Sequence, residues 1–132
     1  MSPPAAKQGD QITATDIHII LVPAAAGATV PTPIPHPFVG IINSGTSTDV
    51  LIEGRGAATV NSTATNTPPH VPQGGPFQKP PTNQGKITMG SSTVLINNKP
   101  AARAGDTAMT CNDPVDAPVG TVVATSTVMI GG

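Results

Sequence analysis

Four side chains of this sequence carry donor atoms that transition metals prefer, and they lie far apart along the chain: His18, His36, His70 and Cys111. They are all of its imidazoles and its only thiol. Three ring nitrogens and one thiolate form the donor set of a closed tetrahedral zinc site, in which the protein supplies every ligand. The sequence therefore predicts a structural Zn²⁺ ion held by these four residues, with iron as the alternative metal.

An internal repeat explains why such distant residues should meet. Residues 94–108 match residues 50–64 at a constant offset of 44, with a Val-Leu-Ile run and an Ala-Ala pair in each. A third copy is divided between the chain ends, where residues 120–130 supply its strand and residues 4–10 its continuation. We expect three units that close in a ring with pseudo-threefold symmetry, so that the C-terminal strand pairs with the N-terminal segment. The units span about residues 4–55, 56–99 and 100–132.

The repeat places three of the four predicted ligands at related positions. His18 and His70 each lie 14 residues after the start of their unit, and Cys111 lies 11 residues after the start of its own. Threefold closure should bring these three positions together near the axis. His36 is an extra member, carried by a longer, proline-rich insertion in the first unit. The prolines beside His36 and His70 reduce the entropy lost when these segments are fixed.

Each unit has the pattern of a β-hairpin. A strand rich in β-branched residues is followed by a short turn and a second extended piece. The predicted turns are residues 53–54 (Glu-Gly) and 97–98 (Asn-Asn), because Asn and Gly tolerate the positive φ of tight hairpins. In the divided unit, residues 131–132 should meet residues 2–3 to form the equivalent turn. Asp10 and Asp106 are predicted turn formers at equivalent positions.

The composition supports one all-β domain over residues 1–132. With 16 Pro and 14 Gly, long helices are unfavourable, and with no Trp, no Tyr and two Phe the core must be thin. A net charge of −1 is too low for a disordered chain of this kind. The proline-rich passages 30–37 and 68–81 are expected to be ordered, extended loops. A bound metal would supply the cohesion that large aromatic side chains do not.

Several function classes are not favoured by the sequence. Six Lys and Arg against seven Asp and Glu, with no basic run, indicate neither nucleic-acid binding nor attraction to anionic membranes. No apolar run approaches the ~20 residues of a membrane helix, and no apolar leader begins the sequence, so we expect cytoplasmic synthesis and no stable membrane anchoring. Nucleophile-elbow and phosphate-loop motifs are absent, and the only glutamate, Glu53, lies in a predicted turn. We therefore expect a protein that is not an enzyme.

Residues 100–103 read Pro-Ala-Ala-Arg and are followed by Gly105-Asp106 and then Cys111. This segment resembles the PAAR family, which is named for that tetrapeptide. The resemblance covers nearly the whole chain, because the three units and the set of three His and one Cys also match the family pattern. It departs from that pattern at Lys7, which replaces the arginine of the first unit, and at residues 56–59 (Gly-Ala-Ala-Thr), which lack both the proline and the arginine.

The resemblance implies a small cone-shaped β protein with its metal near the vertex. The broad base would sit on a trimeric β-helical spike protein of the VgrG type, with one monomer per trimer, in a type VI secretion system, a phage tail or an extracellular contractile particle. The chain, a monomer on its own, would cap and sharpen the spike and help pierce the target envelope. It would be assembled at the tip of the particle and delivered outside the producing cell or into the target. The units fill the sequence, so no effector extension is expected.

Two other functions are compatible with the sequence. In a small zinc hydrolase, His36 would not be a ligand and a water molecule would take its place on the metal. In a β-rich binding module, no metal would be bound at all. The sequence also leaves open whether the strands at residues 50–52, 94–96 and 128–130 form the core or the face presented to the spike.

Overall fold

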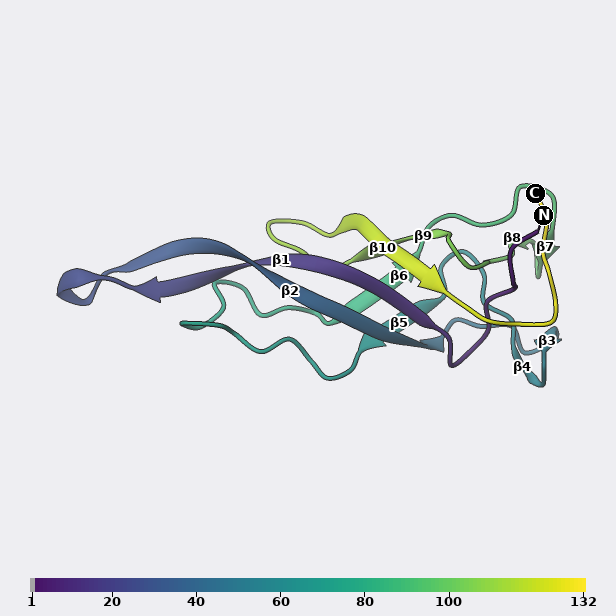
Figure 1. The fold of residues 1–132 in the computed structure, drawn as a ribbon, viewed down its shortest axis with the longest axis horizontal. Helices are drawn as coiled ribbons and strands as arrows, with labels where there is room; N and C mark the ends of the chain where they lie inside the picture. Colours follow the sequence, from purple (N-terminus) through teal and green to yellow (C-terminus); the bar gives the residue numbers. More distant parts are fainter. Residues whose placement is uncertain (1) are drawn as a thin grey trace.

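The computed structural model describes residues 2–132. They form an elongated cone that is broad at one end and narrows to a single projecting hairpin at the other, with both chain ends at the broad end (Figure 1). Apart from one short 3-10 turn, η1 (Ala25–Gly27), the named elements are all strands. The predicted all-β, cone-shaped fold is confirmed. Within residues 2–132, no helix has the length and apolar character needed to cross a membrane.

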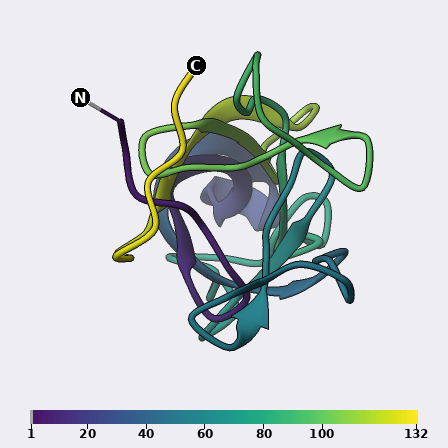
Figure 2. The same ribbon diagram turned by 90° about the vertical axis from the view of Figure 1, so that its right-hand side faces the viewer.

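The body of the cone is a closed six-stranded antiparallel barrel with strand order β1-β10-β9-β6-β5-β2. It is made of three hairpins, and pairing of β1 with β10 closes the ring that Figure 2 shows from the broad end. Closure leaves no free edge around the barrel. Its strands are β1 (Gln11–Pro23), β2 (Thr29–Ser44), β5 (Thr63–Asn66), β6 (Gln84–Ile87), β9 (Thr107–Thr110) and β10 (Ala117–Val123).

A second layer of short hairpins forms the broad end, which we call the base. It contains two two-stranded sheets, β3 (Leu51–Ile52) with β4 (Arg55–Gly56) and β7 (Leu95–Ile96) with β8 (Lys99–Pro100). The turn residues between them have positive φ, as predicted: Glu53 (51°), Gly54 (80°), Asn97 (52°) and Asn98 (63°). In the third unit Pro4 bridges Met129, so the C-terminal strand does pair with the N-terminal segment.

Backbone hydrogen bonds at the centre of the base show the pseudo-threefold symmetry directly. The Ala6 N–H donates to the Ala102 carbonyl, the Ala102 N–H to Ala58, and the Ala58 N–H back to Ala6, each at 3.0 Å. The turns that follow Ala6 and Ala102 are also equivalent. In each of them a carboxylate, that of Asp10 or Asp106, accepts the backbone N–H of the residue three positions earlier. These bonds confirm the predicted turn-forming role of both aspartates.

One aromatic ring fills the axis of the barrel. Phe38 is fully buried, and two glycines leave room for it, Gly40 on the same strand and Gly85 on β6. A Cβ atom at Gly40 would lie 2.6 Å from Phe38 Cε1, and one at Gly85 would lie 3.2 Å from Cζ. Phe38 is the one aromatic ring in the buried core of the described barrel, where it packs with aliphatic side chains such as Ile12, Ile42 and Ile87.

Replacing Phe38 with alanine should therefore leave a cavity on the axis and lower the free energy of unfolding by about 3–5 kcal/mol. Urea unfolding of the metal-loaded protein, followed by circular dichroism, measures this loss. The matched control is Val39→Ala, because Val39 follows Phe38 on β2 but faces outward. A loss for Phe38→Ala no greater than that of the control would contradict the assignment of Phe38 to the core.

The proline-rich passage at residues 30–37 is a β-strand and not the predicted loop. It belongs to β2 and pairs with β1 in unbroken register, with Pro35 opposite Ile17. The prolines occupy alternate positions of β2, and Val39 continues the same alternation. Alternate residues of a strand direct their backbone N–H and C=O groups to the same side. Both backbone groups of Val39 bond residues 66–67, on the side away from β1. The proline nitrogens therefore point away from β1, and no ladder hydrogen bond is lost.

The second proline-rich passage, at residues 68–81, is irregular, as predicted, and lies against the outer edge of β1. The Leu21 N–H donates to the Pro76 carbonyl, and the Gln78 N–H donates to the Ile19 carbonyl. Through these two bonds Phe77 forms an isolated antiparallel β-bridge with Ile20. This segment and the connection between β9 and β10 run along the projecting β1–β2 hairpin (Figure 1).

Candidate metal centre

The predicted ligands are brought together where the β1–β2 hairpin leaves the barrel. β1 supplies His18, and β2 supplies His36, which lies opposite Asp16 in the register. His70 comes from the segment that follows β5, and Cys111 comes directly after β9. All four side chains are buried. Beyond them the hairpin continues toward its turn, so the cluster lies in the narrow half of the cone.

Four residues each place one donor atom within 4.8 Å of the others: Asp16, His18, His70 and Cys111. Three of these are ligands predicted from the repeat, and the fourth, Asp16, is not. A carboxylate side chain is usually exposed to solvent, so the sequence pattern did not predict Asp16 as a metal ligand. The signal was the spacing Asp16-x-His18, since alternate residues of a strand face the same side.

His36 lies beside this group without being one of the four. Its ring centroid is 5.6 Å from that of His18 and 5.5 Å from that of His70. Its Nδ1–H donates to the Ile34 carbonyl at 2.8 Å, because a carbonyl can only accept. Its Nε2 is buried and has no hydrogen-bond partner in residues 2–132. A histidine fixed by a backbone carbonyl with its other nitrogen free has the usual arrangement of a metal ligand.

His18 is held in its neutral form by its surroundings. Burial lowers the pKa of His18 below its ordinary value, and the nearby carboxylate of Asp113 only partly opposes this effect. His18 Nδ1 is buried without a hydrogen-bond partner in the described chain, and His18 Nε2 lies 3.6 Å from Cys111 Sγ. Neutral imidazole is the form that binds metals.

Cys111 shows why a cation suits this position. Burial, and after it the charge of Asp16, raise the pKa of the Cys111 thiol to about 11. A metal ion would reverse this effect, because a coordinating thiol loses its proton outright. The buried nitrogens, the thiol and the carboxylate together fit a divalent ion with nitrogen, sulfur and oxygen ligands.

Phe77 covers the cluster on one side. Its ring centroid lies 5.8 Å from that of His18 and 5.5 Å from that of His36. The ring is carried by the segment that bonds to the edge of β1, so the same contacts that order this segment also shield the two imidazoles. An apolar cover of this kind limits solvent access to a metal site.

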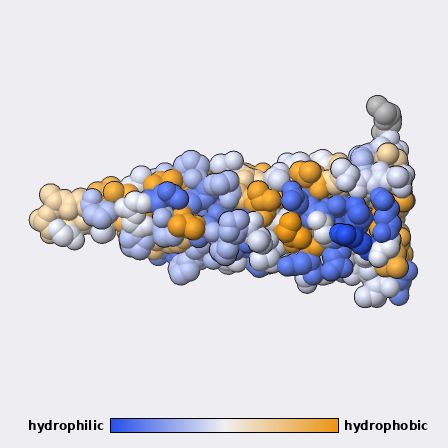
Figure 3. All heavy atoms as spheres, turned by 60° about the horizontal axis from the view of Figure 1, so that its bottom comes forward, coloured by the Kyte–Doolittle hydropathy of each residue, from blue (hydrophilic) through white to orange (hydrophobic). Residues whose placement is uncertain are grey.

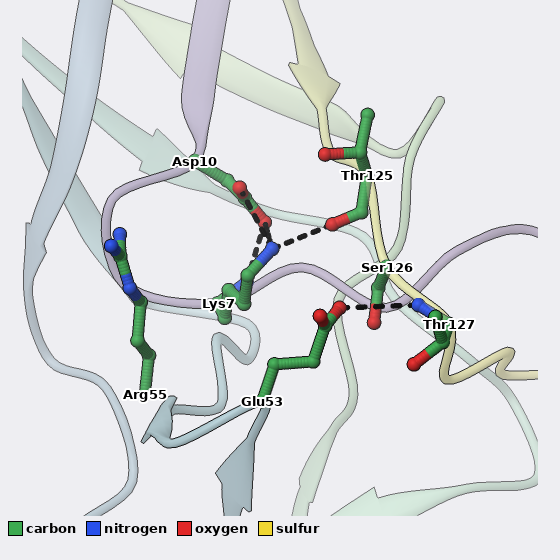
Figure 4. A pocket seen from close by; sticks show the side chains of 7 residues that line it. All are labelled: Lys7, Asp10, Glu53, Arg55, Thr125, Ser126 and Thr127. Atoms are coloured by element: carbon green, nitrogen blue, oxygen red, sulfur yellow. Dashed lines mark hydrogen bonds and ion pairs between the residues drawn. The ribbon is translucent and has the colours of Figure 1, made fainter.

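A surface pocket with a volume of about 570 Å³ lies elsewhere, between units near the base. Figure 4 shows partners for three of its four charged groups, Lys7, Asp10 and Glu53, and draws none for Arg55. Lys7 Nζ donates to Asp10 and to the Thr125 carbonyl, and Glu53 accepts the Thr127 N–H at 3.1 Å. The Ser126 hydroxyl and the Thr127 N–H lower the pKa of Glu53. The only glutamate of the chain thus joins two units.

The family model of the PAAR motif matches residues 33–115 and again residues 77–132, which together cover well over half of the chain. The chain belongs to the PAAR family. Two overlapping matches are what an internal repeat produces, since the same motif can align with more than one unit. No curated protein matches this PAAR chain. Membership indicates a structural role at the tip of a spike in contractile injection systems.

Proposed function

We propose that this PAAR protein is a non-enzymatic tip that caps the trimeric spike of a contractile injection machine. The observation that carries the proposal is an apolar face on the base with one exposed residue from each unit. Leu51, Leu95 and Met129 are 61%, 59% and 55% exposed. In each unit the next residue, an isoleucine, is buried. The base strands therefore serve both purposes, with alternate residues in the core and on the surface.

A threefold apolar face fits a threefold partner. Each of the three exposed residues precedes the turn of its base hairpin, so the set follows the same pseudo-symmetry as the backbone bonds between Ala6, Ala58 and Ala102. Figure 3 shows apolar surface at this broad end of the cone. A single chain with three similar units can present equivalent contacts to all three chains of a trimer. The proposed partner is a trimeric β-helical spike of the VgrG type, bound as one monomer per trimer.

The opposite end suits entry into an envelope. The sequence contains no Asp, Glu, Lys or Arg between residues 17 and 48, which include the part of the β1–β2 hairpin that lies beyond Asp16. Figure 3 shows this narrow end as weakly apolar. We propose that the hairpin is the part that first enters the target, after assembly of the protein at the tip of the particle and its delivery out of the producing cell.

Backbone groups of the hairpin support this role. On the outer edge of β1, the N–H groups of Ile17, Ile19 and Leu21 donate to Asn112 Oδ1, Asp113 Oδ2 and the Pro76 carbonyl. On the outer edge of β2, prolines at positions 31, 33, 35 and 37 remove the N–H altogether. Unpaired donors are costly in an apolar layer. Few remain on this hairpin, although Thr29, next to the turn, keeps its outward N–H.

The metal would stiffen the point where the hairpin leaves the barrel. We propose that His18, His36, His70 and Cys111 hold Zn²⁺, or iron in its place, and so join β1, β2, the segment after β5 and the end of β9. When bound, the ion supplies a structural cross-link. Enzymatic use is not favoured, because the donors are buried, Phe77 covers them on one side and Glu53 is engaged at the base.

The test combines mass and metal content. The purified chain is mixed with the trimeric spike protein of the same particle, and the complex is weighed by native mass spectrometry. We expect one chain per trimer and one metal ion per chain by elemental analysis, without chelators during handling. Three chains per trimer, or no complex at micromolar concentrations, would contradict the capping role. A metal-free chain that still caps the spike would contradict only the structural metal.

A further inference from the structure

We propose that Asp16 is itself a metal ligand through Oδ2, and that Thr110 and Asn112 orient its carboxylate through Oδ1. This inference rests on the proposed metal site of the tip. It adds an oxygen ligand that a set of three histidines and one cysteine does not contain.

Asp16 is the only fully buried acidic side chain in residues 2–132, with an exposed fraction of 0%. Removing a carboxylate from water costs several kcal/mol unless an opposite charge compensates it. Lys and Arg form no ion pair with Asp16 in the part of the chain that the structure describes, and its ion-pair partner there is His70, at 2.8 Å. The buried carboxylate therefore lacks a permanent cation, which a metal ion would provide.

The two oxygens of Asp16 have different surroundings. Oδ1 accepts the hydroxyl of Thr110 and the amide of Asn112, neither of which is a candidate ligand. Oδ2 faces His70 Nε2 at 2.8 Å and Cys111 Sγ at 3.5 Å, both of which carry candidate donor atoms. A carboxylate that binds a metal is commonly fixed in this way, with one oxygen on the ion and hydrogen bonds from neighbouring groups. The arrangement therefore directs Oδ2, and not Oδ1, to the ion.

Charge balance supports the same assignment. A divalent ion with three neutral imidazoles and one thiolate keeps a net positive charge, which is costly in a buried site. The carboxylate of Asp16 supplies the second negative charge, so that the ion, the Cys111 thiolate and Asp16 are neutral together. The other carboxylate beside the cluster, that of Asp113, lies 3.6 Å from His18 Nδ1 and has its own cation, Lys79 Nζ, at 4.0 Å. The presence of a buried acid beside a buried thiol is then explained by the ion that both would face.

The test measures Zn²⁺ affinity by chelator competition and the ligand set by the visible absorption of the Co²⁺-loaded protein. Asp16→Asn should weaken Zn²⁺ binding at least about 100-fold, at the upper end of what loss of a supporting group costs, and should change the Co²⁺ bands. Thr110→Val keeps the carboxylate but removes its anchor. It should weaken binding roughly 10-fold and leave the Co²⁺ bands in place.

The matched control is Asp106→Asn, which neutralises another buried carboxylate that accepts a backbone N–H, pairs with Arg103 and is not part of the cluster. This variant should lose stability and keep its Zn²⁺ affinity and Co²⁺ bands. If Asp16→Asn binds Zn²⁺ as tightly as the control and shows unchanged Co²⁺ bands, the assignment of Asp16 is wrong.

Three further outcomes are decisive. If Asp16→Asn does not fold, the Thr110→Val result decides, because an unchanged affinity in that variant would show that the Asp16 carboxylate does not hold the ion. If the unmodified chain binds no metal, the inference falls together with the structural metal, whereas the mass of the spike complex still tests the capping role separately. If the unmodified chain binds one ion and neither variant affects it, only the inference on Asp16 fails.

Discussion

Cys111→Ala is expected to abolish stable metal binding and to cost the protein most of its stability. Metal binding and folding are coupled in small sites, and a structural zinc ion contributes on the order of 10 kcal/mol. The chain has little else to replace it, since it contains no Trp or Tyr and its barrel axis is filled by one Phe. Thermal unfolding followed by circular dichroism should show a large decrease in Tm, and elemental analysis after gel filtration should show no retained metal.

Chelation provides the control for this variant. The unmodified chain treated with a strong chelator should unfold near the temperature of Cys111→Ala, and the chelator should have no effect on the variant itself. The remaining difference between the two metal-free proteins measures the lost packing of the sulfur atom, about 1 kcal/mol. If the variant and the unmodified chain unfold at the same temperature, and chelation changes neither, Cys111 has no part in a structural metal site.

Placing a carboxylate on the base should have the second large effect. In each of the variants Leu51→Asp, Leu95→Asp and Met129→Asp, a charge would be buried without a partner when the base meets the spike. Such a charge costs about 3 kcal/mol or more, which corresponds to roughly 100-fold in Kd. The three side chains are exposed, so the isolated chain should fold normally. Calorimetric titration against the trimeric spike measures the loss.

The matched controls lie away from the base. Val30, on the projecting hairpin, and Val71, after β5, are also exposed apolar residues. Val30→Asp and Val71→Asp should bind the spike as the unmodified chain does. Equal losses in the base variants and in these controls would show a general effect of charge, and unchanged binding of all three base variants would exclude the base as the docking face.

Much of the fold could be predicted because similar units recur along the sequence and pack together in one ring in the structure. The offset between residues 50–64 and 94–108 predicted equivalent hairpins, and the closed triangle of backbone bonds follows that equivalence. The turns at residues 53–54 and 97–98 could be predicted because positive φ favours Gly and Asn, which occupy three of the four positions, with Glu53 the exception. The pairing of the two chain ends followed from the divided third unit.

Other features depend on contacts that a repeat does not encode. Asp16 has no equivalent metal-binding residue in the repeat pattern, and only the meeting of β1 with the end of β9 shows its position beside Cys111. The sequence predicts an ordered, extended loop at residues 30–37, because clustered prolines make a chain stiff and extended rather than helical. The tolerance of these prolines in a strand depends on register, which places every proline nitrogen on the outer edge of β2.

That outer edge affects how copies of the chain meet at high local concentration. An exposed strand normally offers alternate N–H and C=O groups to which a strand of another molecule can add, and this is a common route to aggregation. Four prolines remove the donors from the exposed edge of β2, and the segment around Phe77 occupies the edge of β1. Two copies of the chain therefore cannot readily join through shared β-sheet at this hairpin, and the long, weakly apolar projection can remain monomeric.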